Sequence, residues 1–86
     1  MDINDLIAII KKKLEREIII EKVEIQDKSF LHINHSGYQK GKFHLKLIIV
    51  SKDLNDISKI DSNKKIYKIL DEEIKNYIHS IQIIIS

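Results

Sequence analysis

Histidine is the residue type best suited to chemistry in this sequence, because the chain has four histidines and no cysteine. His32, His35 and His44 lie in or beside one central segment, and His79 lies near the end of the chain. Neutral imidazole binds zinc, iron and copper. Three of the histidines also have an ordinary interpretation: His35 as a solvated surface residue, His44 as a packed strand residue, and His79 as a cap on helix carbonyls. Without cysteine the chain cannot close a structural zinc site alone, so a metal site completed by a partner fits better.

Other reactive patterns are weak. The sequence lacks a G-x-G-x-x-G motif and a P-loop, and the segment from Gly37 to Gly41 has the wrong spacing for either. The serines have no recognisable nucleophile context. The acidic run Asp71-Glu72-Glu73 predicts a solvated helix face. We therefore expect no catalytic residues and a protein that is not an enzyme.

Composition indicates one globular domain over residues 1–86. The net charge of +2 is weak, and the basic clusters at residues 11–13 and 64–65 are interspersed with acidic residues, as on solvated helix faces. No apolar run approaches the roughly 20 residues of a membrane span. The N-terminus is acidic and enters a helical pattern at once, unlike a secretory or transit signal. We expect a cytoplasmic protein without membrane contact, and a mitochondrial location stays open.

Hydrophobic periodicity predicts the elements that would position the histidines. Apolar residues recur at helical spacing from Ile3 to Leu14, and β-branched residues then predict a strand from about residue 18 or 20 to Gln26. The pattern vanishes over residues 27–42, and such glycine-containing loops often carry function. Clean alternation over residues 43–50 predicts a second strand, antiparallel to the first.

The last third of the chain predicts two helices and a strand. A short helix is expected at residues 54–58. A longer one begins with Asp61 or Ser62 as N-cap and ends near residue 77 or 78, and its inner stripe is formed by Ile66, Tyr67, Leu70, Ile74 and Tyr77. Residues 80–85 are too short and too β-branched for another helix, so they predict a third strand. The order α-β-β-α-α-β predicts a two-layer α+β sandwich with a three-stranded sheet.

Four segments in this order resemble the BolA family. Residues 27–35 (DKSFLHINH) resemble its D-x-S-x-x-H-x-x-H region, and residues 43–51 resemble its H-F-x-V-x-I-V-S strand with the histidine and aromatic differently placed. Residues 66–74 resemble V-Y-x-x-L-x-x-E, and residues 78–83 resemble V-H-A-L-x-I. The similarity extends from about Leu6 to Ile85. It implies a fold similar to class II KH domains, without their phosphate-binding loop.

The resemblance also implies a function. BolA-like proteins are partners of monothiol glutaredoxins, and the heterodimer shares a [2Fe-2S] cluster. The glutaredoxin cysteine and glutathione hold one iron, and the BolA protein helps to hold the other. His79 matches the C-terminal ligand of the family and His32 matches the ligand in the long loop, with His35 as a substitute and His44 as a donor that fixes a neighbour's tautomer. No cofactor is expected in the isolated chain.

A second function is kept as the alternative. A nucleic-acid-binding transcriptional regulator with a KH-like or helix-turn-helix-like surface would use Lys64, Lys65 and Lys68. The family often has an R-H-R triplet at the start of the long helix, whereas this chain has Ser62-Asn63-Lys64, which removes much of the basic character. A third interpretation is a purely structural interaction module in which the histidines are incidental.

Overall fold

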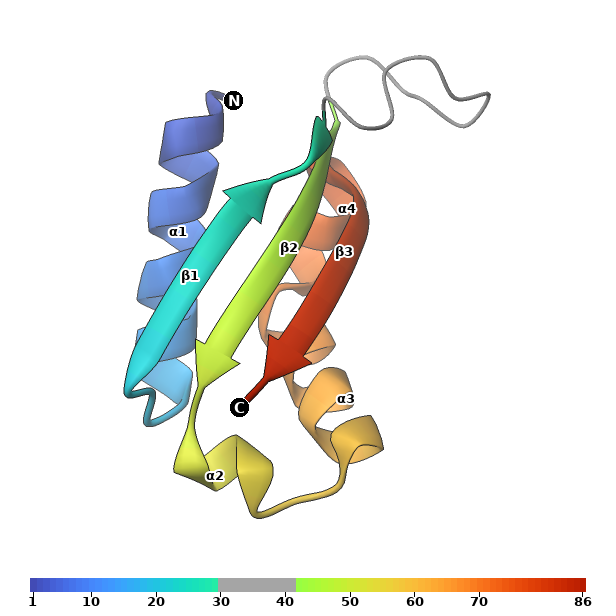
Figure 1. The fold of residues 1–86 in the computed structure, drawn as a ribbon. Helices are drawn as coiled ribbons and strands as arrows, with labels where there is room; N and C mark the ends of the chain where they lie inside the picture. Colours follow the sequence, from blue (N-terminus) through green and yellow to red (C-terminus); the bar gives the residue numbers. More distant parts are fainter. Residues whose placement is uncertain (30–41) are drawn as a thin grey trace.

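The computed structural model describes residues 1–29 and 42–86. Its elements follow the order α1 (Ile3–Glu17), β1 (Lys22–Asp27), β2 (Phe43–Val50), α2 (Lys52–Asn55), α3 (Lys59–Ile69), α4 (Asp71–Asn76) and β3 (Ile78–Ile85). The three strands form one sheet, and α1, α3 and α4 lie on the same side of it (Figure 1). The predicted two-layer α+β architecture is confirmed.

Helix α1 forms where the sequence predicts it, because its apolar residues share one face. Asp2 caps the helix: its side chain accepts a hydrogen bond from the backbone N–H of Asn4 at 3.0 Å. Leu6, Ile10 and Leu14 are fully buried against the sheet and the other helices. The amphipathic pattern therefore positions α1 correctly before any tertiary contact is known.

The sheet has β2 at its centre. Strand β1 pairs with β2 antiparallel, as predicted, in a register that places Ile25 opposite Leu47, and β3 pairs with β2 in parallel. Alternate residues of β2 face the helices, and Leu45, Leu47 and Ile49 are buried there. The opposite face of the sheet carries no helix in the described part of the chain (Figure 1). We call this side of the sheet the open face.

The helical region between β2 and β3 differs from its prediction. The short helix covers Lys52–Asn55, because the Ser51 hydroxyl accepts a hydrogen bond from the Leu54 N–H. Helix α3 begins after Ser58, whose hydroxyl accepts from the Asp61 N–H at 3.1 Å, so the predicted caps at Asp61 and Ser62 are wrong. A single residue, Leu70, separates α3 from α4 where one helix was expected.

For two side chains of this region, the exposure predicted from the sequence is wrong. Tyr67 was placed on the inner stripe, but 44% of its surface is exposed, whereas Ile66 and Leu70 are fully buried. Glu73 was placed on a solvated face, but it is 5% exposed and forms an ion pair with Lys13 of α1 at 2.6 Å. The ion pair joins α4 to α1. In residues 1–29 and 42–86, no helix has the length and apolar character needed to cross a membrane.

Candidate metal-binding histidine site

His79 lies at an irregularity in β3. Phe43 of β2 pairs with Ile78, but the next β2 residue, His44, pairs with Ser80, so β3 contains one extra residue at this point. That residue is His79. A bulge of this kind redirects side chains and is common beside functional sites.

The bulge determines on which face of the sheet the side chain of His79 lies. Ile78 is 3% exposed and Ile81 packs against the same core, although the two are three residues apart and a regular strand would place them on opposite faces. Because of the extra residue, neither His79 nor Ser80 has to face the helix-covered side of the sheet. His79 is exposed, within strand β3 and not at the end of the preceding helix as its capping interpretation required.

His44 packs beside His79. The two ring centroids are 4.8 Å apart and the ring planes are inclined by 56°. His44 is only 4% exposed, and its Nδ1 lies 2.6 Å from the Ser80 hydroxyl oxygen. The proton in this hydrogen bond can belong to either group, depending on the tautomer of His44. The buried ring is thus held in place, and the exposed ring of His79 rests against it.

The backbone of His44 is fixed by the residues that follow β1. Its N–H donates to the Ser29 hydroxyl at 3.1 Å, and its carbonyl accepts from the Lys28 N–H at 2.7 Å. The Ser29 N–H in turn donates to the Asp27 carboxylate at 3.0 Å. The D-x-S part of the sequence therefore ties the end of β1 to the start of β2. It holds the position from which the segment containing His32 and His35 departs.

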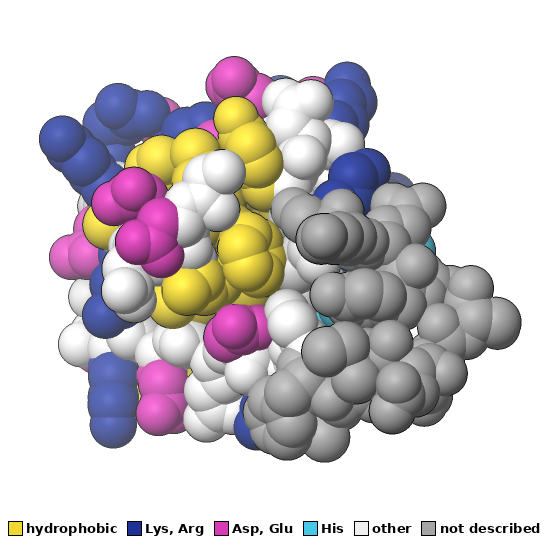
Figure 2. All heavy atoms as spheres, turned by 90° about the horizontal axis from the view of Figure 1, so that it is seen from above, with side chains coloured by type: hydrophobic (Ala, Val, Ile, Leu, Met, Phe, Trp, Pro, Cys, Tyr) yellow, Lys and Arg dark blue, Asp and Glu magenta, His cyan; other side chains and the backbone are white. Residues whose placement is uncertain are grey.

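A cavity of about 530 Å³ lies next to the histidine pair on the open face. Its lining is mixed: it includes the two lysines Lys28 and Lys46, the polar residues His44, Ser80 and Gln82, and the apolar residues Leu45 and Ile81. Figure 2 views this end of the molecule from above, and it shows histidine surface only at the border of the segment that the structure does not describe. The site is therefore a shallow, positively charged surface around two imidazoles.

The structure places two of the four predicted histidines together. His44 and His79 meet across β2 and β3, whereas His32 and His35 lie outside the described residues. In the described part of the chain, no group of three or more His, Cys, Asp or Glu side chains could hold a metal ion. The metal-binding side chains that the described residues bring together here are therefore the two imidazoles of His44 and His79.

Sequence reasoning missed the two serines that hold His44 in place, and it missed the bulge. One signal in the sequence could have revealed the bulge. Isoleucine occupies positions 81, 83 and 85 as well as 84, and the next apolar position toward the N-terminus is 78 and not 79. A break of phase in a strand that otherwise alternates indicates an extra residue.

The Ser80 hydroxyl is expected to set the orientation of His44. In Ser80→Ala this hydrogen bond is lost, so the free energy of unfolding should fall by about 1 kcal/mol and the ring resonances of His44 and His79 should shift. Urea unfolding and histidine side-chain NMR measure the two effects. Ser86→Ala, at the other end of the same strand, is the matched control. Unchanged ring resonances in Ser80→Ala would show that the hydroxyl does not orient the pair.

Comparison with known proteins identifies the family. A model of the BolA-like protein family matches residues 14–86. A relative from Haemophilus influenzae, named DNA-binding transcriptional regulator BolA, is 33% identical over 73 residues, which cover 85% of this chain and 68% of the relative. SufE-like protein 1 of Arabidopsis thaliana is 30% identical over 80 residues, 87% of this chain but 22% of that protein. The chloroplastic protein BOLA1 of the same plant is 28% identical over 78 residues, 86% of this chain and 48% of that protein.

Solved structures share the fold. The BolA domain of SufE1 from Arabidopsis thaliana superimposes with a TM-score of 0.77 at 29% identity, covering 92% of this chain and 87% of that one. BolA1 from the same organism gives a TM-score of 0.76 at 23% identity, covering 91% and 86%, and shows likeness of fold alone. The resemblance found in the sequence is confirmed by the family model and by these structures. The chain belongs to the BolA-like protein family.

Proposed function

We propose that this protein is a non-enzymatic adaptor in iron–sulfur cluster assembly or trafficking. It binds a monothiol glutaredoxin and completes a bridging [2Fe-2S] cluster through histidine. The observation that supports this proposal most is the bulge in β3, which presents the exposed imidazole of His79 against the buried ring of His44. A strand irregularity that serves only packing would have no need to bring two imidazoles together.

The histidines have different roles in this proposal. His79 is the ligand, because its ring is exposed and a partner can approach it. His44 is a positioning residue, because it is buried and its Nδ1 is engaged with Ser80. His32 is proposed as the second ligand and His35 as its substitute, since the segment carrying both begins at Ser29, which is hydrogen-bonded to His44.

The charge around the site suits an anionic assembly. Lys28 and Lys46 line the cavity beside the histidine pair. A cluster held by thiolates and the carboxylates of glutathione are negatively charged, so nearby ammonium groups favour their approach. The chain has no cysteine, and the thiolates are therefore assigned to the glutaredoxin and to glutathione.

Reconstitution tests the proposal. The protein is mixed with a monothiol glutaredoxin, glutathione, ferrous iron and sulfide without oxygen, and visible absorption and circular dichroism are recorded. We expect a heterodimer whose spectrum differs from that of the glutaredoxin homodimer, because histidine replaces thiolate at one iron. A mixture that gives only the homodimer spectrum, with no heterodimer on gel filtration, would remove the adaptor proposal.

One observation favours nucleic-acid binding as a second candidate function. A groove of about 460 Å³ between α1 and α3 is lined by Lys13, Arg16, Lys65 and Lys68, together with Glu17 and Ile69. The groove unites two of the three lysines predicted for this role, while Lys64 does not line it. The relative from Haemophilus influenzae is named a DNA-binding transcriptional regulator. Lys13 is paired with the buried Glu73, whereas Arg16 forms only an exposed ion pair with Glu17 at 3.7 Å, so Arg16, Lys65 and Lys68 would contact phosphates.

This second function predicts binding to duplex DNA that weakens steeply with salt. Three phosphate contacts give a slope of about −3 in a plot of log affinity against log salt, and Lys68→Ala should reduce its magnitude by about 1. Fluorescence anisotropy with a labelled duplex measures both values. Lys75→Ala, on α4 and outside the groove, is the matched control. Absence of measurable binding at low salt would exclude the second function.

A further inference from the structure

We propose that two copies of this chain associate through the free edge of β3, forming a continuous six-stranded sheet in which the two β3 strands run antiparallel. The interface lies at the C-terminal half of β3, beside α2 and α3. It contains neither His44 nor His79, although it adjoins the cavity beside them, which Ile81 and Gln82 also line. The inference therefore stands or falls independently of the proposed cluster function.

Strand β3 presents free backbone groups along this edge. Among residues 1–29 and 42–86 it is an outer strand of the sheet, with β2 on one side only. The Ser86 N–H donates to the Ile49 carbonyl at 2.8 Å, and the Ser86 carbonyl accepts from the Ser51 N–H, so both groups of Ser86 face β2. Because the direction alternates along a parallel strand, Ile81, Ile83 and Ile85 direct their N–H and C=O groups away from β2.

The edge lacks the protection that the other edge of the sheet has. Strand β1 carries Lys22, Glu24 and Asp27, which discourage strand addition. Strand β3 (IHSIQIII) contains no Lys, Arg, Asp or Glu, and it has neither glycine nor proline. Two copies can therefore meet along it without like charges facing each other. Natural proteins seldom leave such an apolar edge unpaired.

The apolar surface beside this edge is larger than the strand alone. In the described part of the chain, six large hydrophobic side chains are exposed, and three of them lie on α3 or on the turn before it: Ile57, Ile60 and Tyr67. Ile84 of β3 is also exposed, but its side chain lies on the open face, opposite to those of Ile83 and Ile85. Ile60 and Tyr67 share one face of α3 with Asn63, since the three are spaced i, i+3 and i+7. In a dimer formed through the β3 edge, the α3 helices of the two copies would face each other with these sides.

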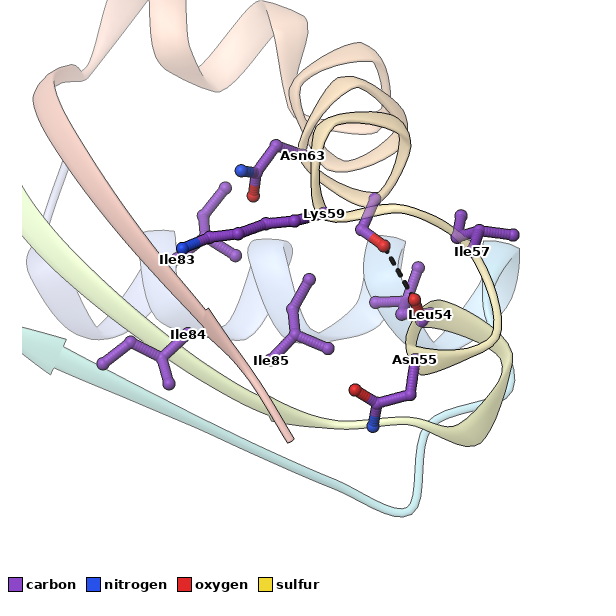
Figure 3. A pocket seen from close by; sticks show the side chains of 9 residues that line it. Leu54, Asn55, Ile57, Lys59, Asn63, Ile83, Ile84 and Ile85 are labelled. Carbon is purple, nitrogen blue, oxygen red and sulfur yellow. Dashed lines mark hydrogen bonds between the residues drawn. The ribbon is translucent and has the colours of Figure 1, made fainter.

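A groove joins the strand edge to α3. Figure 3 shows the cavity of about 260 Å³ between the end of β3 and α2–α3, with Ile83 and Ile85 on one side and Leu54, Ile57 and Asn63 on the other. The Asn63 Oδ1 is buried and accepts no hydrogen bond from any described residue. Buried acceptors in native proteins are normally paired, either with ordered water or with a donor from another molecule.

The strand is complementary to itself in one register. With the two-fold axis at Ile83, Ile83 pairs with its counterpart, and Ile81 pairs with Ile85 of the other copy. All these residues direct their backbone groups outward, so each pair exchanges two hydrogen bonds. Their side chains lie on the helix-covered face, where they would extend the core into the groove. A single strand edge thus explains both the free backbone groups and the apolar groove.

Of the described residues that line the groove, only Lys59 has a charged side chain. Figure 3 shows it extending toward Ile83, but no ion pair or hydrogen bond holds it among the described residues. Its long, exposed side chain can turn into solvent when the second copy binds, because lysine keeps its ammonium in water while its stem covers apolar surface. Lys59 therefore does not prevent a second copy of the chain from binding at the apolar edge of β3.

Sedimentation velocity and amide exchange test the proposal on the intact protein. We expect a concentration-dependent dimer, and Ile84→Lys and Ile60→Lys should each raise its dissociation constant at least about tenfold. Ile19→Lys, at an isoleucine between α1 and β1 that is about as exposed as Ile60, should leave it unchanged. In NMR, exchange at the amides of Ile81, Ile83 and Ile85 should slow as the dimer forms, while exchange at Gln82 and Ile84, which face β2, should not change.

Each other outcome overturns the inference. A chain that stays monomeric at the highest attainable concentration has no self-association. A dimer in which the Ile83 amide still exchanges rapidly uses another surface. Protection of Ile83 that appears only after addition of a glutaredoxin would assign the edge to that partner. If Ile84→Lys fails to fold, Ile60→Lys and the exchange measurement on the unmodified protein still decide the matter.

Discussion

Replacement of His79 by alanine is expected to reduce the amount of cluster-bound heterodimer at least about tenfold, because an iron then loses its nitrogen ligand. The residual cluster should show the spectrum of the glutaredoxin homodimer. Visible absorption and circular dichroism after reconstitution measure the change. The effect should come from ligation and not from folding, because His79 is exposed and lies at a bulge, where its side chain supports little of the core.

Two further variants make the result specific. Asn76→Ala, exposed in α4 just before β3, should leave the heterodimer yield unchanged. His44→Gln should have an intermediate effect, because the His79 ring keeps its donor atoms but loses the buried ring beside it. Wild-type yield and spectrum in His79→Ala would contradict its role as the ligand, provided that urea unfolding shows the variant to be folded.

Removing one member of the Lys13–Glu73 ion pair is expected to cause the largest loss of stability. Lys13→Ala should lower the free energy of unfolding by about 3 kcal/mol, because it leaves the carboxylate of Glu73 buried without its cation. Glu73→Ala should cost less, because the Lys13 side chain is 26% exposed and its ammonium can reach water. The double variant Lys13→Met/Glu73→Leu should lie close to wild type.

Urea unfolding of the three variants measures this asymmetry. Lys12→Ala and Glu15→Ala are the matched controls, because both residues are exposed on α1 near Lys13, and they should change stability by no more than about 0.5 kcal/mol. Equal losses for Lys13→Ala and Glu73→Ala would show that the burial of the carboxylate is not the dominant cost.

Most of the fold follows from local patterns in the sequence. The apolar residues from Ile3 to Leu14 repeat at helical spacing, and Asp2 caps the helix, so α1 could be placed closely. Strand β2 was predicted with its observed bounds, because residues 43–50 alternate cleanly. These elements form as expected because the same residues satisfy local propensity and core packing.

The differences arise where packing decides and local sequence does not. Neither proline nor glycine marks the break between α3 and α4, and Leu70 leaves the helical conformation while its side chain stays fully buried. Glu73 lies in an acidic run that is typical of a solvated face, and only the approach of Lys13 from a distant helix allows its burial. Such contacts join residues far apart in the chain, so periodicity cannot predict them.

The candidate site was predicted in its residues but not in its arrangement. His44 and His79 were both selected by type and position, yet their contact depends on the pairing of β3 with β2 and on the bulge. The sequence around Ser29 and Ser80 did not indicate a role for either residue. Their role is visible only in the structure, where both form hydrogen bonds with His44. His32 and His35 fall outside the described residues, and their roles stay predictions.

Pulsed EPR of the reduced heterodimer tests histidine ligation most directly. The protein is labelled with ¹⁵N-histidine, the glutaredoxin is unlabelled, and the hyperfine coupling to the cluster is recorded. We predict a strong ¹⁵N coupling from this chain that disappears in His79→Ala and persists in Asn76→Ala. A cluster-containing heterodimer without any ¹⁵N coupling would contradict the assignment of His79, and of histidine from this chain, as a ligand of the cluster.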